Sequence, residues 1–132
     1  KGSKKVFYRK KINMLNTFNK QIAKIHFRKG YNTKIVKVNT LNYFLKKFYN
    51  NKKKIDLLKI DVEGEELNVL KSINLNSHQT RLISIEIHNQ YSMYEDNSYY
   101  FKKNNIYKFL ISKKYKMVWK NQYSFIFKRK FR

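Results

Sequence analysis

The stretch IDLLKIDVEGEE at residues 55–66 decides how this chain is interpreted, because it joins an apolar run to a group of carboxylates. Residues 55–60 are mostly apolar, and Asp61, Glu63 and Gly64 follow closely. A short, nearly continuous apolar run predicts a strand buried on both faces of a parallel sheet. In open α/β sheets, ligands bind just beyond the carboxyl ends of the strands. We therefore predict a ligand site at Asp61 and Glu63.

Acidic residues are confined to the middle of a strongly basic chain. The 132 residues include 31 Lys and Arg but 8 Asp and Glu, which gives a formal charge of +23. All eight acids lie at positions 56–96, five of them within residues 55–66, whereas the flanks hold 28 of the 31 basic residues. This concentration indicates that the carboxylates have a use where they stand. The excess positive charge predicts binding of polyanions without sequence preference at low salt.

Length and composition indicate one folded domain. The length is that of one domain, and 42% apolar residues with 11 Tyr and 10 Phe argue against intrinsic disorder. The lack of Cys excludes disulfides and thiolate metal sites and fits a reducing compartment. No apolar run reaches the roughly 18 residues that span a bilayer, and the first residues lack the apolar segment of a secretory signal. We expect a cytoplasmic protein.

Alternating strand and helix patterns predict an α/β fold. Three apolar, β-branched segments predict strands, and they lie at residues 33–38, 55–60 and 82–87. Two helical patterns lie between them, at residues 41–48 and 65–73. Thr40 is suited to cap the first of these helices. The strand–helix–strand–helix–strand order favours parallel pairing. Two last strands predict a closing antiparallel hairpin, at residues 115–119 and 124–128.

The remaining segments are less regular. Weaker patterns predict a strand at residues 6–8, a helix within residues 13–27 and a helix at residues 106–114. Polar residues predict loops at 74–80 and 89–105. Long loops over a strand end often serve as lids or substrate loops.

Three segments share the order and spacing of a known set of motifs. They are VNTLNYFLKKF, IDLLKIDVEGEELNVLKSI and RLISIEIHN, at residues 38–48, 55–73 and 81–89. They resemble the V-x-TLD, DLLKIDVEGxE and I-x-x-E-x-H motifs of the FkbM-type S-adenosylmethionine-dependent methyltransferases. DLLKIDVEG is highly specific, and the resemblance covers about residues 6–128. Asn42 stands in place of the Asp of TLD, so no carboxylate role is carried over to that position.

The resemblance implies a Rossmann-like, doubly wound methyltransferase sheet, of which this chain holds the C-terminal part and its antiparallel hairpin. The three glycines include no G-x-G, so the Gly-rich cofactor loop and the first βα units are expected upstream. We expect one partial methyltransferase domain over residues 1–132, with a basic N-terminal segment at 1–35 and a motif-bearing α/β core at 36–128. The strand at 55–60 should then lie at a sheet edge, and the fragment should be inactive alone.

The resemblance implies S-adenosylmethionine as cofactor and O-methylation of a small-molecule or sugar hydroxyl. Asp61, Glu63 and Gly64 are the expected cofactor-binding residues, and Asp61 would face either the cofactor or the acceptor. Removal of the hydroxyl proton requires a base, for which His88 and Glu86 are the candidates beside Asp61. Adjacent strands lie about 4.8 Å apart, so Asp61 and Glu86 should share one site.

Other interpretations of these residues stay open. Asp61 could be a helix cap, Glu63 a solvated turn residue, and Glu86 with His88 a hydrogen-bonded structural pair. The same four side chains offer ligands that suit Mg²⁺, but their spacing does not demand a metal, so no metal ligand is assigned. For Glu65 the favoured interpretation, shared with Glu66, is a complement to the positive end of a helix.

Two other classes of function compete with the enzyme. Aromatic residues interleaved with Lys, as in LKKFYNNKKK at residues 45–54, would suit a basic domain that binds single-stranded nucleic acid. A non-catalytic remnant of an enzyme is the second alternative. The favoured partner is a small-molecule or saccharide acceptor, with no specific nucleic acid and no membrane span.

Overall fold

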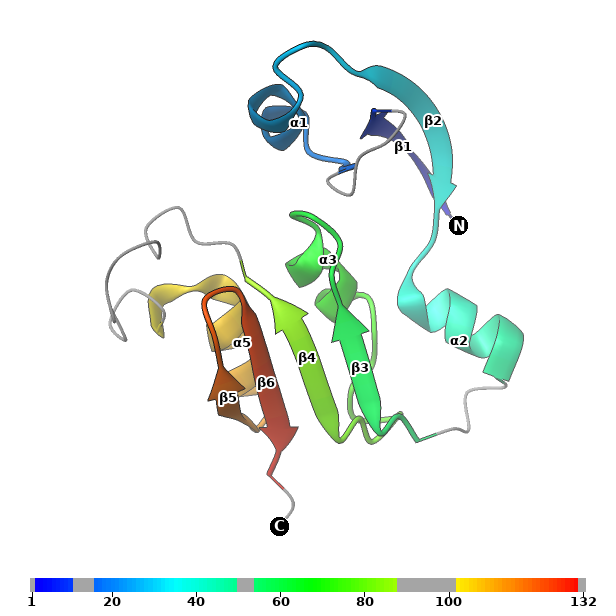
Figure 1. Cartoon of the computed structure of the whole chain (residues 1–132). Coiled ribbons are helices and arrows are strands. Elements are labelled where there is room, and N and C mark those ends of the chain that lie inside the picture. Colours follow the sequence, from blue (N-terminus) through cyan, green and yellow to red (C-terminus); the bar gives the residue numbers. More distant parts are fainter. Residues whose placement is uncertain (1, 11–15, 50–53, 88–101, 131–132) are drawn as a thin grey trace. The chain divides into compact units, whose positions relative to one another are not determined.

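Figure 1 shows a computed structural model of the chain, which describes residues 2–10, 16–49, 54–87 and 102–130. The chain forms two compact units. The first contains residues 1–48 and 62–73, and the second contains residues 49–61 and 74–132. The backbone therefore enters the second unit, returns to the first for one short segment, and leaves it again. The expected single domain over residues 1–132 stays a prediction.

The first unit is built on two antiparallel strands. They are β1 (Ser3–Arg9) and β2 (Asn32–Val38), paired over seven positions from Ser3 with Val38 to Arg9 with Asn32. The strands predicted at residues 6–8 and 33–38 are thus confirmed.

Helix α1 (Lys20–His26) lies between these strands in the sequence. The Asn19 side chain caps it by accepting hydrogen bonds from the backbone N–H groups of Gln21 and Ile22. Ala23 and Phe27 are buried on its inner face. The helix predicted within residues 13–27 is thus confirmed, and residues 11–15 lie outside the described residues.

Two further helices belong largely to the first unit, α2 (Leu41–Tyr49) and α3 (Glu66–Lys71). The Thr40 hydroxyl accepts the backbone N–H of Tyr43 at 3.1 Å, which confirms the predicted cap of α2. The Ser72 hydroxyl, just after α3, accepts the backbone N–H of Leu41 at 3.0 Å. The C-terminal end of α3 is therefore hydrogen-bonded to the start of α2.

The second unit contains a mixed four-stranded sheet. Its strand order is β3–β4–β6–β5, formed by β3 (Leu57–Ile60), β4 (Leu82–Glu86), β6 (Ser124–Arg129) and β5 (Tyr115–Lys120). Strands β3 and β4 run parallel, whereas β6 runs antiparallel to both β4 and β5. The predicted closing hairpin is confirmed. Helix α5 (Asn105–Ser112) precedes β5 and is capped by the Asn104 side chain.

Two expectations about the sheet are wrong. The strand at residues 33–38 does not extend the parallel sheet, because β2 pairs antiparallel with β1. An apolar strand pattern sets the side-chain faces but not the partner, and β1 satisfies its backbone along the whole strand. Burial on both faces also fails for β3, where Leu57 is 57% exposed and Ile60 is buried. The cause is the position of β3 at the edge of the described sheet, which the sequence did predict.

The core of the second unit lies on one face of β4 and β6. Ile83 and Ile85 alternate with less buried residues on β4, and Phe125 and Phe127 do the same on β6. Leu110 of α5 is fully buried as well. An alternating pattern of this kind is typical of a sheet covered on one face.

Tyr115 gives this core a measurable response to alkaline pH. Its hydroxyl donates a hydrogen bond of 2.6 Å to the backbone oxygen of Thr80. Burial raises the pKa of Tyr115 above 10.0, although the charge of Arg129 and the side chain of Thr80 oppose this. Because the unfolded chain then ionises first, the contribution of Tyr115 is complete below pH 10 and declines as the pH rises beyond it.

We expect Tyr115→Phe to lower the free energy of unfolding by about 1 kcal/mol at neutral pH through the lost hydrogen bond. The difference between the variant and the parent should shrink as the pH rises above 10. Urea unfolding followed by circular dichroism, at neutral pH and above pH 10, measures the difference in the free energy of unfolding. Tyr43→Phe, at an exposed position, is the control. An equal loss at both pH values would contradict the assignment.

Candidate active site

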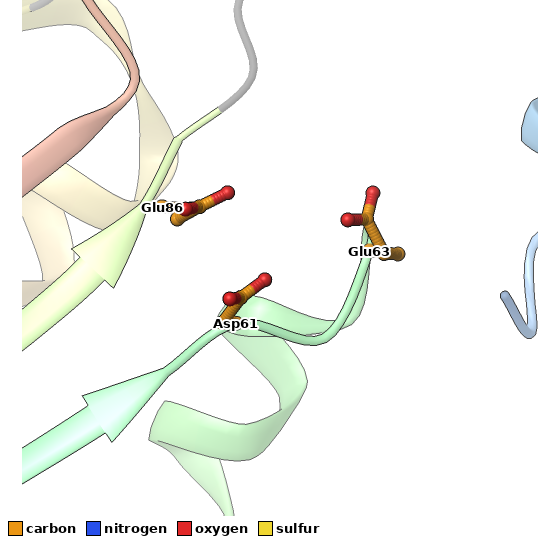
Figure 2. A group of neighbouring side chains, drawn as sticks. All are labelled: Asp61, Glu63 and Glu86. Atoms are coloured by element: carbon orange, nitrogen blue, oxygen red, sulfur yellow. The ribbon is translucent and has the colours of Figure 1, made fainter. Parts of the chain in front are cut away.

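Asp61 and Glu86 stand side by side at the carboxyl ends of two parallel strands. The register pairs Ile60 of β3 with Ile85 of β4, so the next residue on each strand is the acid. Their carboxylates offer oxygen atoms within 4.8 Å of each other. Figure 2 shows both side chains just beyond the arrowheads of β3 and β4. Both residues belong to the second unit.

The surroundings of Asp61 are partly open to solvent. Its side chain is 38% exposed, and its carboxylate lies 3.5 Å from the Lys59 ammonium. Lys59 is itself 67% exposed, so this ion pair contributes little to stability. Two carboxylates at this separation repel each other by about 1 kcal/mol where water screens them. A positively charged group between them would remove that repulsion.

The arrangement therefore suits a cation or a hydroxyl-bearing ligand. Carboxylate oxygens accept hydrogen bonds from hydroxyl and ammonium groups, and they are also the ligands that Mg²⁺ prefers. Two carboxylates do not by themselves distinguish a metal ion from an organic cation. No other feature of the described residues supports a magnesium site.

A tight turn follows β3 and leads into α3. The turn and α3 belong to the first unit. Glu63 and Gly64 both have positive φ angles, 47° and 97°. The Thr17 hydroxyl, on a fully buried side chain, donates a hydrogen bond of 2.7 Å to the backbone oxygen of Glu63. The Gly64 N–H donates to the Glu66 carboxylate at 2.9 Å. The turn is thus held from both sides.

The structure describes four of the five predicted site residues. Asp61 and Glu86 are brought together at the strand ends, and Glu63, also labelled in Figure 2, belongs with Gly64 to the turn that follows. His88 lies outside the described residues. The roles of all five stay predictions.

Glu65 and Glu66 stand at the start of α3, as expected of acids that complement the positive end of a helix. Glu66, buried to 6% exposure, begins α3 and accepts a hydrogen bond from the turn. Glu65 makes no capping hydrogen bond and instead pairs with Lys5 of β1 at 3.0 Å.

Ser124 is a residue that the sequence did not single out. It is the register partner of Glu86 on β6, so it lies at the same end of the sheet. The pattern of residues 124–128 predicted the strand, but nothing in it predicted which residue of β4 each position faces.

None of the helices in the described residues has the length and apolar character needed to cross a membrane.

In open α/β sheets, ligands bind just beyond the carboxyl ends of the strands, which is where Asp61 and Glu86 lie. The model of the methyltransferase FkbM domain matches residues 2–117 of this chain. The chain therefore belongs to the FkbM methyltransferase family. No curated protein and no solved structure matches it. The family match gives no support to the nucleic-acid-binding alternative.

Proposed function

We propose that this chain is part of an S-adenosylmethionine-dependent O-methyltransferase that acts on a hydroxyl of a small molecule or sugar. The observation that carries the proposal is the Asp61–Glu86 pair, with carboxylate oxygens within 4.8 Å at the ends of parallel strands. Membership of a methyltransferase family supports it independently. A Rossmann-like sheet and a Gly-rich cofactor loop outside these residues are part of the same proposal.

The chemistry of the donor set fits such a cofactor. When bound, S-adenosylmethionine supplies an electrophilic methyl group on a positively charged sulfur. Asp61 is a partly exposed carboxylate at a strand end, and it can accept hydrogen bonds from the cofactor's ammonium or hydroxyl groups. Its negative charge would also attract the positively charged groups of the cofactor. Asp61 is thus the proposed cofactor-binding residue, and Glu63 and Gly64 of the following turn are proposed beside it.

Glu86 is the proposed base of this site. A hydroxyl is a poor nucleophile, so its proton must be taken up as the new bond to carbon forms. Glu86 is a half-buried carboxylate level with Asp61, and one of its oxygens can accept that proton. Residue His88 stays the second candidate. In this scheme the protein chiefly positions the acceptor and removes its proton.

Methyl transfer is tested with the complete gene product. S-adenosylmethionine labelled with tritium in its methyl group is incubated with a panel of alcohols and sugars. We expect label in an acceptor, in a linkage that resists alkali as an ether does. Label in an alkali-labile ester, or none in any acceptor despite bound cofactor, would contradict methylation of a hydroxyl group.

A further inference from the structure

A cavity of about 330 Å³ lies within the first unit. Polar and apolar side chains from β1, β2 and α3 share its wall. They include Lys5, Phe18, Val38, Asn39, Glu65 and Asn68. Ligand pockets measure about 300–1,000 Å³, so this one has room for a single ring rather than an extended molecule.

The charges in the cavity cancel. Lys5 Nζ lies 3.0 Å from each carboxylate oxygen of Glu65, and the two side chains are 42% and 19% exposed. The Asn68 amide donates a further hydrogen bond of 2.7 Å to Glu65. One cation and one anion in mutual contact leave no net charge for a ligand to neutralise. A charged ligand would lose hydration here without gaining a partner of opposite charge.

The remaining hydrogen-bonding capacity includes both donors and acceptors. Two of the three Lys5 N–H groups point to Glu65, so one remains. Glu65 accepts three hydrogen bonds from the described residues, which leaves about one of its four lone-pair positions. The Asn39 amide adds two N–H donors and an oxygen acceptor. A hydroxyl group both donates and accepts, and therefore matches such a wall better than a carboxylate or an ammonium.

Another part of the wall is apolar. The Phe18 ring and the Val38 side chain line the cavity together with Val69 of α3. Lys5 Nζ lies 5.9 Å from the centre of the Phe18 ring, so the polar and aromatic parts adjoin. A ligand with hydroxyls on its rim and C–H groups on its face satisfies both.

We propose that this cavity binds a neutral ring compound that carries several hydroxyl groups, the chemical class of a monosaccharide or cyclitol. Its hydroxyl groups form hydrogen bonds with Lys5, Glu65 and Asn39. Its C–H face packs on the ring of Phe18. The identification of this compound as the methyl acceptor rests on the proposed function, whereas binding to the cavity does not.

Nuclear magnetic resonance of the ¹⁵N-labelled full chain tests binding. The probes are myo-inositol and the methyl glycosides of common neutral hexoses, with glucosamine and glucuronate as charged analogues. We expect at least one neutral probe to shift the amide signals of Asn39 and Asn68, with a dissociation constant on the order of 10 mM or lower. Shifts with charged analogues alone, or with none of the probes, would overturn the proposal.

Variants separate the cavity from the remaining surface. Asn39→Ala should weaken binding about fivefold through one lost hydrogen bond, while Asn32→Ala at the opposite end of β2 should leave it unchanged. Glu65→Gln should create a preference for an anion, because Lys5 then lacks its counterion and glucuronate should bind better than glucosamine. An unchanged preference would contradict the role of the ion pair. Circular dichroism shows whether each variant remains folded.

The outcome for the cavity is separable from that for the enzyme. Binding without methyl transfer to the bound probe in the complete gene product would retain the cavity and reject the acceptor assignment. Methyl transfer to acceptors that never shift the cavity's signals would retain the proposed function and reject the cavity as the acceptor site.

Discussion

Glu86→Gln should lower the rate of methyl transfer by about 10²–10⁴-fold, the usual contribution of a general base. Gln has the size of Glu and keeps a hydrogen-bonding oxygen, but it does not take up a proton at neutral pH. Binding of S-adenosylmethionine, measured by calorimetry on the complete gene product, should change much less than the rate. This combination distinguishes a base from a residue that holds the cofactor.

The other members of the site provide the comparison. Asp61→Asn should weaken cofactor binding, since it removes negative charge from the strand end. Asp56→Asn alters an exposed acid just before β3, outside the pair, and should change neither quantity. His88→Gln tests the second candidate base. A full rate in Glu86→Gln together with a large loss in His88→Gln would assign the base to His88 and refute the role given to Glu86.

Gly64→Ala should be the most destabilising single exchange in the turn, costing about 3 kcal/mol. Two effects add. The φ angle of 97° disfavours any residue with a Cβ atom, at a cost of about 1–3 kcal/mol. The new Cβ would also lie 2.7 Å from Cδ1 of Ile22, on a helix packed against the turn. Because Cδ1 is the end of a flexible side chain, Ile22 can move aside, so this contact adds a smaller cost than the strained backbone does.

Gly30→Ala separates the two effects. Gly30 has a similar φ of 92°, but nothing lies within 4 Å of an added Cβ. This variant should show the conformational cost alone. Adding Ile22→Val to Gly64→Ala removes the clashing methyl group and should recover part of the loss. Urea unfolding of the four proteins measures these differences, and equal losses in Gly64→Ala and Gly30→Ala would show that the contact with Ile22 does not matter.

Local pattern was enough to predict the Asp61–Glu86 pair. Each acid ends a short apolar strand, and parallel pairing of consecutive strands brings their carboxyl ends together. The cap of α2 by Thr40 and the final hairpin were predicted for the same reason, since their signals lie within a few residues. These features depend on neighbours in sequence or on one simple pairing.

Features that depend on distant residues could not be predicted. The pattern of β2 is that of a strand, but it does not specify β1 as its antiparallel partner. The exposure of Leu57 follows from the edge position of β3 rather than from its own side chain. Lys5 and Glu65 are 60 residues apart, and no periodicity relates them. The cavity that they line could therefore not be predicted from the sequence.

The return of residues 62–73 to the first unit has a consequence for biosynthesis. When the ribosome has made residues 1–48, β1 and β2 can pair, but Lys5 has no counterion and Thr17 lacks the Glu63 carbonyl. Those partners emerge only after β3, whose own neighbour β4 is still to come. The first unit is therefore complete only when residue 73 has been made, and the second only after the later strands, so a stop between residues 48 and 62 would leave neither complete.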